Sequence, residues 1–375
     1  MITLIILIIT VFYLVLIGSL VVGFDKVERF NLSDKKPTLK FSVVIPFRDE
    51  AKNLSRLLAS LEALKYPKSM FEVILVNDES TDGSVAVIQT FSKSSNLQIR
   101  FFDTVRTTES PKKDAVTLAI SKANYEWIVS TDADCEVPNY WLDAYDEFIT
   151  SQQLKMVIGP VMYAQLDSFL KRFQALDVLS LQGSSMGGFG IKKPFLCNAA
   201  NMAYQKRFFD GLNGFQGNAD IASGDDIFLL QKALKAAKDK IGYLKSELAV
   251  VNTKSEDSWN NLFNQRRRWA SKTRHYRGSF GKLAGMMVFL MNGTLICAVL
   301  LAFVGMVGFE FLGYIIVIKL LIDFLLLYKS ARFFDKESLL ASYLFAGILY
   351  PFFVVGVAFS SMFRDFRWKG RRFSK

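Results

Sequence analysis

The protein has 375 residues, of which 51% are hydrophobic, and a formal net charge of +11 at pH 7. A single histidine excludes a His-rich metal site, and three widely separated cysteines exclude both a disulfide framework and a cysteine-ligated metal. Because many of the basic residues flank apolar segments, the charge favours an anionic membrane surface or a phosphorylated substrate over nucleic acid.

The chain opens with an uncharged apolar run, residues 2–24, which is long enough for the roughly 20 residues that a helix needs to cross a bilayer. No lysine or arginine precedes this run, whereas Lys26 and Arg29 follow it. A cleaved signal peptide would need a charged start and a small-residue cleavage site. We therefore expect a retained membrane anchor over residues 1–25, with the following chain in the cytoplasm.

The middle of the chain alternates short apolar strands with helical stretches, and we expect one cytoplasmic α/β domain over residues 38–280. Such alternation predicts βαβ units on a mostly parallel sheet, with ligands at the carboxyl ends of the strands. Three polar clusters, 46–50, 77–82 and 131–136, lie at such strand ends. Residues 165–190 predict a helix that lies either at the membrane surface or on the sheet. The expected strands are 41–45, 71–76, 98–102 and 127–130, and the expected helices are 49–64, 84–94 and 113–122.

Residues 281–375 predict a C-terminal membrane region with two to three transmembrane helices and a basic tail. Residues 283–328 are long enough for two helices, and 339–362 form a third candidate span. Three spans would place the tail from Arg364 outside, against the positive-inside rule. Either one segment lies in the interface without crossing, or the tail is an exception. The protein is expected to be a multi-pass protein of the cell (inner) membrane.

Lys319 and Asp323 stand one helical turn apart inside an apolar span. Charges at that depth are costly and indicate a function, or else the two neutralise each other and stabilise helix packing.

Two acidic clusters follow strands of the expected sheet. Asp78 can accept hydrogen bonds from a base or ribose, or it can form a turn that caps the next helix. Asp132 and Asp134, two residues apart in a loop, can converge on a divalent cation and its bound phosphates, which suits Mg²⁺ or Mn²⁺. A pair with this spacing also occurs in ordinary polar turns.

Two further clusters lie later in the chain. Asp225 and Asp226 stand in front of a helix, where they favour the helix dipole or where one acts as general base on an acceptor hydroxyl. Gln265 and Trp269 flank a run of three arginines, Arg266 to Arg268, just before the membrane region. This run is either a basic patch for anionic lipid or a clamp for a diphosphate beside an acceptor pocket.

In this order, the clusters resemble the family 2 glycosyltransferases, and the resemblance covers roughly residues 40–275. The segments that carry it are Val43–Glu50, Val76–Ser84, the D-x-D of 132–134, the acidic pair of 225–226 and the Q-x-x-R-W of 265–269. The last motif is typical of membrane-embedded members such as cellulose, hyaluronan and poly-N-acetylglucosamine synthases and ceramide glucosyltransferases. The resemblance implies a GT-A-like, nucleotide-sugar-binding α/β fold.

The resemblance also implies roles for individual residues. The donor-binding residues would be Pro46, Arg48, Glu50, Asp78, Lys112, Asp132, Gln265, Arg268 and Trp269, and the metal ligand would be Asp134. The catalytic residues would be Asp226, Asp225 and Arg268, with Asp226 as the base, and the acceptor side would hold Asn198, Asn201 and Trp269. Two departures from the family pattern stand out. Pro111-Lys112-Lys113 leaves open which lysine approaches the diphosphate, and the loop at 197–203 lacks a usual glycine.

The implied reaction is a metal-dependent, inverting transfer from a UDP-sugar, which forms a β-glycosidic bond. The acceptor is a membrane lipid or lipid-linked hydroxyl, or alternatively a polysaccharide that is extended and exported, with a possible partner membrane subunit. A pyrophosphorylase would need a glycine-rich loop after the first strand, and residues 46–50 contain no glycine. A membrane scaffold with a decayed sugar-nucleotide site is the non-enzyme alternative, which the acids at 78, 132, 134 and 226 disfavour.

Overall fold

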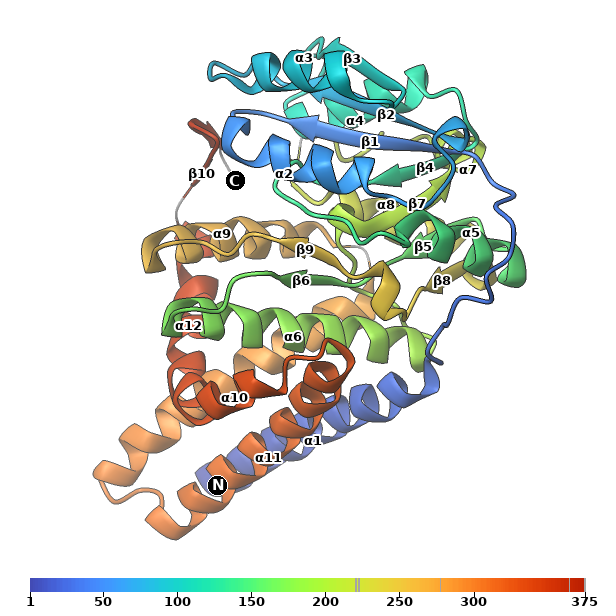
Figure 1. Ribbon diagram of the computed structural model, residues 1–375. Helices are drawn as coiled ribbons and strands as arrows, with labels where there is room; N and C mark the ends of the chain where they lie inside the picture. The colour runs from blue at the N-terminus through green and yellow to red at the C-terminus, as the bar shows by residue number, and fades with distance from the viewer. Residues whose placement is uncertain (220, 222, 277, 364, 374–375) are drawn as a thin grey trace. The chain divides into compact units, whose positions relative to one another are not determined.

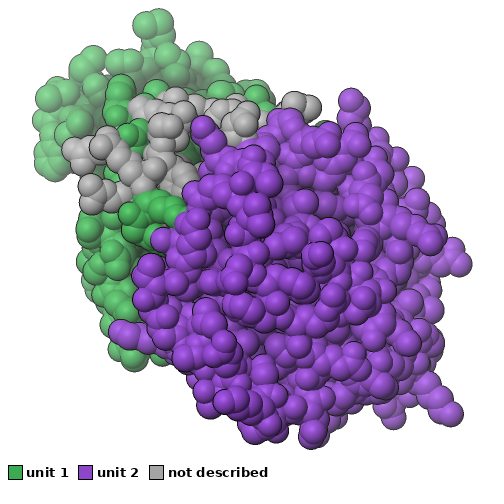
Figure 2. All heavy atoms as spheres, turned by 90° about the horizontal axis from the view of Figure 1, so that it is seen from above, with its two compact units in different colours: residues 1–27, 165–196, 255–375 green, residues 28–164, 197–254 purple. Residues whose placement is uncertain are grey.

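The computed structural model describes the chain except for residues 220, 222, 277, 364 and 374–375. Arg364, the first residue of the predicted basic tail, therefore lies outside the described residues. The chain forms two compact units (Figure 2). One holds residues 28–164 and 197–254, and the other holds residues 1–27, 165–196 and 255–375. We call them the sheet unit and the helical unit.

The sheet unit is built on a seven-stranded sheet with the order β3-β2-β1-β4-β7-β5-β8 (Figure 1). Within it, β7 runs antiparallel to both of its neighbours, and the other adjacent strands are parallel. The predicted mostly parallel sheet is therefore confirmed. The bounds are β1 (Phe41–Phe47), β2 (Phe71–Asn77), β3 (Ile99–Asp103), β4 (Trp127–Ser130), β5 (Met156–Ile158), β7 (Met202–Gln205) and β8 (Ile241–Tyr243), and a separate parallel pair joins β6 (Val161–Tyr163) to β9 (Val251–Thr253).

The helices of this unit pack by the spacing that the sequence predicts. Leu54, Leu57, Leu58 and Leu61 form one face of α2 (Ala51–Glu62), and all four are fully buried against the core of β1 and β2. Every residue of β2 is buried, as expected for a central parallel strand. The other helices are α3 (Ser84–Ser94), α4 (Pro111–Lys122), α5 (Trp141–Gln152), α7 (Lys206–Gly211) and α8 (Asp225–Ala237).

Among its described residues, the helical unit contains four segments that are long and apolar enough to cross a membrane, as predicted at both ends of the chain. They are α1 (Ile2–Lys26), α10 (Ser279–Phe303), α11 (Phe309–Phe333) and the stretch Glu337–Phe363, which contains η6 (Glu337–Ser342) and α12 (Tyr343–Phe363). Two helices, α6 (Phe169–Gly190) and α9 (Trp259–Ser271), complete the unit, and β10 (Phe366–Trp368) and β11 (Arg371–Phe373) form a C-terminal hairpin.

Helix α6 packs against α1 and α11, a contact that neither sequence-based alternative for residues 165–190 included. The close approach depends on glycine, because a Cβ atom at Gly187 would collide with the backbone of Leu20, and one at Gly190 with that of Gly23. This packing places residues 165–196 and 255–280 in the helical unit, whereas the sequence predicted a single domain over 38–280. The predicted domain bounds stay a prediction, since compactness alone does not define a functional domain.

Lys319 and Asp323 form an ion pair with 2.7 Å between Nζ and Oδ2, and Lys319 is only 2% exposed. The Tyr13 hydroxyl on α1 donates a 2.6 Å hydrogen bond to the other oxygen of Asp323. The pair therefore joins α11 to α1, which fits the packing alternative.

Candidate active site

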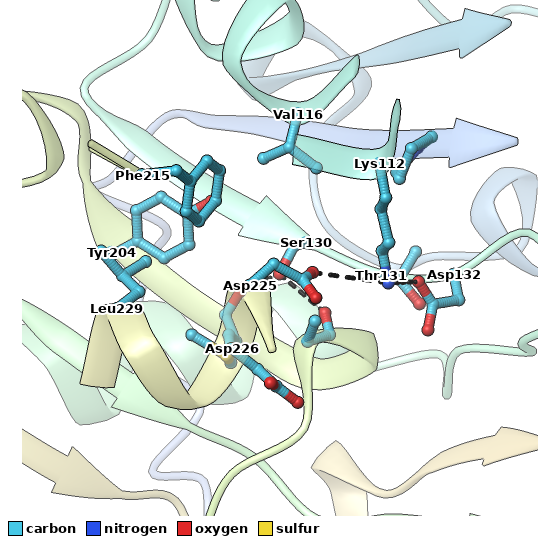
Figure 3. A pocket seen from close by; sticks show the side chains of 13 residues that line it. Lys112, Val116, Ser130, Thr131, Asp132, Tyr204, Phe215, Asp225, Asp226 and Leu229 are labelled. Carbon is cyan, nitrogen blue, oxygen red and sulfur yellow. Dashed lines mark hydrogen bonds and ion pairs between the residues drawn. The ribbon is translucent and has the colours of Figure 1, made fainter. Parts of the chain in front are cut away.

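An open cleft with roughly 310 Å³ of empty space lies in the sheet unit where β4 ends (Figure 3). The Lys112 ammonium lies between two carboxylates there, 2.7 Å from Oδ1 of Asp132 and 3.5 Å from Oδ2 of Asp225. Asp226 also lines the cleft, but its carboxylate points away from Lys112 (Figure 3). Five residues of the predicted site thus line one opening: Pro46, Lys112, Asp132, Asp225 and Asp226.

The charge of Lys112 is fixed by its neighbours. Burial opposes the ammonium form, but the nearby carboxylates of Asp132 and Asp225 outweigh burial and raise the pKa of Lys112. Burial and the charge of Asp225 raise the pKa of Tyr204, so its phenol, already neutral at pH 7, also stays protonated in alkaline solution. The cleft therefore combines one permanent cation, several carboxylates and a neutral hydrogen-bonding ring.

The two adjacent lysines of α4 have different partners, which bears on the question left open by the sequence. Lys112 lines the cleft, whereas Lys113 is 2% exposed and donates to the carbonyls of Asn218 and Ile221, at 2.6 and 2.7 Å. Lys113 thus ties down the loop that leads into α8. Consequently, Lys112 is the lysine that is available to an anionic ligand.

Asp114 fixes the approach to α4. Its carboxylate accepts hydrogen bonds from the backbone amides of Thr107 and Thr108 and from the Thr107 hydroxyl. Burial raises its pKa, but these hydrogen bonds more than offset burial, and the net shift lowers the pKa of Asp114. The turn before Lys112 is therefore held by an ionised carboxylate.

Asp225 and Asp226 open helix α8, where carboxylates are favoured by the helix dipole. The preceding Gly224 adopts φ +86°, a left-handed conformation that turns the chain into the helix. The dipole alternative and the functional one are compatible here, because the same two side chains also line the cleft.

At the ends of β1 and β2, the predicted base-binding residues form one connected loop pair. Arg48 donates to the carbonyls of Asp78 and Glu79 at 2.7 and 2.9 Å, so its guanidinium ties the two loops together. Asp78 is only 3% exposed. Its Oδ1 lies 3.4 Å from Nη2 of Arg106, a partner that sequence analysis missed. Glu50 is largely buried and accepts from the Asn53 amide, which gives it a role at the start of α2.

Metal binding by this site is tested by its donor set. Among the described residues, no group of three or more His, Cys, Asp or Glu side chains could by itself hold a metal ion. Mg²⁺, however, is commonly bound by one or two carboxylates together with substrate phosphates. Asp134 is half-buried two residues after Asp132 but is not among the residues that line the cleft, so its role as the metal ligand stays a prediction. The buried Thr131 hydroxyl lines the cleft without a hydrogen-bond partner among the described residues, which further suits a polar ligand.

The predicted acceptor-side residues Asn198 and Asn201 differ in burial and in hydrogen bonding. Asn201 is fully buried, accepts hydrogen bonds from Trp141 and Tyr145, and donates to the carbonyls of Pro160 and Ala249. These four bonds use its whole hydrogen-bonding capacity, which does not fit the expected contact with an acceptor. Asn198 is half-buried and caps the short helix η2 (Ala199–Asn201). The missed cleft residues Met202 and Tyr204 alternate along β7, which is the strand signal that could have identified them.

The Q-x-x-R-W segment lies on α9 in the helical unit, so its expected meeting with the cleft stays a prediction. Within α9, Arg266 is 6% exposed, pairs with Asp177 at 2.6 Å and stacks over Trp269 at 4.2 Å. The lipid-patch alternative therefore does not describe Arg266, whose guanidinium instead orients the tryptophan. Gln265 contacts Arg266 and donates to Glu256 at 3.0 Å. Burial raises the pKa of Glu256 despite the neighbouring arginines.

Comparison with known families decides the identity. Residues 42–210 match the family described as Glycosyl transferase family 2. A match to Glycosyl transferase family group 2 covers residues 127–356, which is more than half of the 375-residue chain. The chain belongs to the family 2 glycosyltransferases.

Two curated relatives illustrate the range of the family. The glycosyltransferase is 26% identical over 177 residues to the poly-beta-1,6-N-acetyl-D-glucosamine synthase of Staphylococcus epidermidis, covering 45% of this chain and 41% of that one. It is 25% identical over 203 residues to the glycosyltransferase AglE of Haloferax volcanii, covering 53% and 63% respectively. The chain thus spans about half the length of these relatives.

A solved structure shares the fold of the glycosyltransferase. The mannosyltransferase PcManGT from Pyrobaculum calidifontis, in complex with GDP-Man and Mn²⁺, matches with a TM-score of 0.56 at 15% identity, covering 97% of this chain and 99% of that one. This likeness confirms the predicted GT-A-like α/β fold with membrane-type helices at both ends.

Proposed function

We propose that the glycosyltransferase moves a sugar from a UDP-sugar to a hydroxyl of a membrane lipid or lipid-linked acceptor, with inversion to a β-glycosidic bond. The observation that carries this proposal is the cleft in which Lys112 lies between Asp132 and Asp225, with Asp226 on the same wall. One cation and several carboxylates at the carboxyl end of a parallel strand suit a sugar nucleotide and an acceptor hydroxyl.

Each residue of the cleft has a proposed task. Lys112 stabilises negative charge on the departing diphosphate, and Asp132 contacts the nucleotide sugar. Asp226 takes the proton of the acceptor hydroxyl, whose oxygen then attacks the anomeric carbon from the face opposite the diphosphate. The carbon–oxygen bond to the diphosphate breaks as the new glycosidic bond forms. Arg268, Gln265 and Trp269 belong to the donor or acceptor side in this proposal.

A divalent cation, Mg²⁺ or Mn²⁺, would be held by Asp134 and the donor diphosphate and would supply positive charge to the leaving group. The loops at Pro46, Arg48 and Asp78 would hold the base. Because the fold neighbour binds GDP-Man, a guanine nucleotide belongs in any donor screen. We place the protein in the cell (inner) membrane with the sheet unit in the cytoplasm, because Lys26 and Arg29 follow α1.

A polysaccharide acceptor is the second candidate, favoured by the poly-beta-1,6-N-acetyl-D-glucosamine synthase among the relatives. Four candidate spans are few for a self-sufficient export channel, so this alternative would require a partner membrane subunit. Product size separates the two: a glycolipid enters organic solvent, whereas a polymer stays in the aqueous or insoluble fraction.

The test is a screen of UDP-glucose, UDP-N-acetylglucosamine and GDP-mannose with membranes that contain the full chain, with Mg²⁺ or Mn²⁺ present. Nucleotide release is measured, and the molecular mass of the extracted product is determined by mass spectrometry. We expect release with a UDP-sugar and a loss of about 10²–10⁴-fold in Asp226→Asn, the range for removal of a general base.

Asp239→Asn is the matched control, since Asp239 is exposed in η3 (Lys238–Lys240) and does not line the cleft. Full activity of Asp226→Asn would remove Asp226 as the base. An intact, folded wild type that is inactive with every donor would favour the scaffold alternative instead.

A further inference from the structure

The C-terminal hairpin of β10 and β11 packs against α9 within the helical unit. In the same region, the charge of Lys369, in the hairpin turn, acts on Glu256, three residues before α9. The described hairpin therefore lies beside α9, whatever path residues 337–363 take to reach it.

Helix α9 and the end of α1 are both tied covalently to the sheet unit. Trp259, the first residue of α9, follows Lys254, the last residue of the sheet unit, after four intervening residues. Those residues include Glu256 and Asp257, which are too polar to cross a bilayer. Similarly, α1 ends at Lys26, and the sheet unit begins at Glu28. Both helix ends must consequently lie on the same side of the bilayer as the sheet unit.

Helices α10 and α11 form a helical hairpin that leaves this side and returns to it. Only residues 304–308 join them, and Phe303 and Phe309 are in edge-to-face contact across the link. At the other end of α11, Lys329 forms an ion pair with Asp25 near the end of α1, with 2.7 Å between Nζ and Oδ2. The carboxyl end of α11 is therefore level with the carboxyl end of α1, on the side of the sheet unit.

Residues 337–363 start and finish on this same side. The Tyr343 hydroxyl donates a hydrogen bond to the carbonyl of Leu320, near the middle of α11. The segment therefore reaches about as far into the membrane as the middle of α11. Further along, Phe353 contacts Phe173 of α6 and Phe263 of α9, and Ser360 accepts from Arg267 of α9. Figure 1 shows α12, at the red end of the colour scale, running past α6 and α9 before the chain turns into β10.

We propose that residues 337–363 form a re-entrant segment, which enters the membrane from the side of the sheet unit and leaves it on that side. The chain then crosses the bilayer three times, through α1, α10 and α11. The tail's charged side chains meet the anionic lipid headgroups of the leaflet that faces the sheet unit. Among the side chains that the structure describes, these are Lys369 and Arg371.

Physical chemistry favours this path over a fourth crossing. With four crossings, the basic tail would lie opposite the sheet unit, against the positive-inside rule, whereas three crossings satisfy it. Pro351 lies inside α12 and removes one backbone hydrogen bond, which suits a bent segment more than a straight span. Its exposed apolar side chains, such as Phe345 (68%) and Phe352 (60%), supply a surface for the acyl chains.

Sidedness labelling tests this inference without any assay of sugar transfer, so its outcome does not depend on the proposed function. The background protein carries Cys197→Ser and Cys297→Ser, and the buried Cys135 stays. Single cysteines are then introduced as Arg371→Cys in the hairpin, Ser94→Cys in the sheet unit and Met306→Cys in the link between α10 and α11. Sealed vesicles of both orientations are treated with a membrane-impermeant maleimide.

We expect Arg371→Cys to be labelled in the same vesicle orientation as Ser94→Cys and opposite to Met306→Cys. Labelling together with Met306→Cys would show a fourth crossing and overturn the inference. A second readout is needed in case the folded hairpin prevents the maleimide from reaching the cysteine at position 371. A C-terminal fluorescent protein, which fluoresces only in the cytoplasm, is compared with a C-terminal phosphatase, which is active only outside. With the sheet unit in the cytoplasm, as proposed above, fluorescence supports the re-entrant path, and phosphatase activity contradicts it.

Discussion

Lys112 and Lys113 are neighbours in the sequence, but their side chains contact different parts of the sheet unit. Lys112 lies among the carboxylates of the cleft, whereas Lys113 holds the loop before α8 through two backbone carbonyls. Sequence alone could not separate them, because consecutive residues in the first turn of a helix differ in direction only by about 100°. The neighbouring loop decided which of the two was buried.

Lys112→Met should lower kcat for nucleotide release by about 10²–10³-fold, the cost of removing one preorganised group that stabilises a developing negative charge. Its melting temperature should stay near that of the wild type. Lys113→Met is the matched comparison and should lower the melting temperature, because it removes two charge-assisted hydrogen bonds in a buried site. Steady-state kinetics and thermal unfolding of detergent-purified protein measure both effects. Equal activity losses with equal destabilisation would contradict the division of roles.

At the scale of elements, strand and helix positions in the sheet unit followed from residue periodicity. The leucines of α2 and the apolar run of β2 were sufficient, since each has one strong pattern. Periodicity could not reveal that α6 packs on α1, because that contact depends on backbone approach at glycines far apart in sequence. Nor could it show that Asn201 is saturated by core hydrogen bonds, since the same asparagine would suit an acceptor loop.

Gly187→Val should disrupt the contact between α6 and α1, because its Cβ would collide with the backbone of Leu20. Overpacking of this kind costs about 1–3 kcal/mol. Gly285→Val on α10 is the matched control, since a Cβ there meets nothing within 4 Å. Size-exclusion profiles and melting temperatures in detergent compare the two variants. A stable, monodisperse Gly187→Val protein would show that α1 and α6 do not depend on this close contact.

At the scale of the whole molecule, the helical unit is assembled from three separate stretches of chain, and two of them interrupt or follow the sheet unit. The sequence predicted membrane segments at the two ends of the chain and one cytoplasmic domain between them. Instead, α6 lies in the middle of the chain, with Phe173 and Leu179 buried in the helical unit. Apolar end segments were visible from composition, but the attachment of α6 to them required the three-dimensional contacts.

A chain trimmed to residues 28–278 should therefore aggregate in aqueous buffer without detergent. Trimming removes α1 and α11, the helices that cover α6, and exposes a large apolar surface. Sedimentation and light scattering measure the outcome, with the full chain in detergent as the reference. A soluble monomer of residues 28–278 would contradict the assignment of α6 to the membrane-side helices.

The glycine contact between α1 and α6 also has a consequence for synthesis. The ribosome completes α6 before it makes α10 and α11, so while residues 191–278 are being added, α1 is the membrane-type helix that α6 can meet. Gly23, Gly187 and Gly190 give the nascent chain a tight dimer of helices at that stage. The hairpin of α10 and α11, which is made later, then packs against a helix pair that has already formed. The apolar surface of α6 is therefore partly covered before synthesis ends.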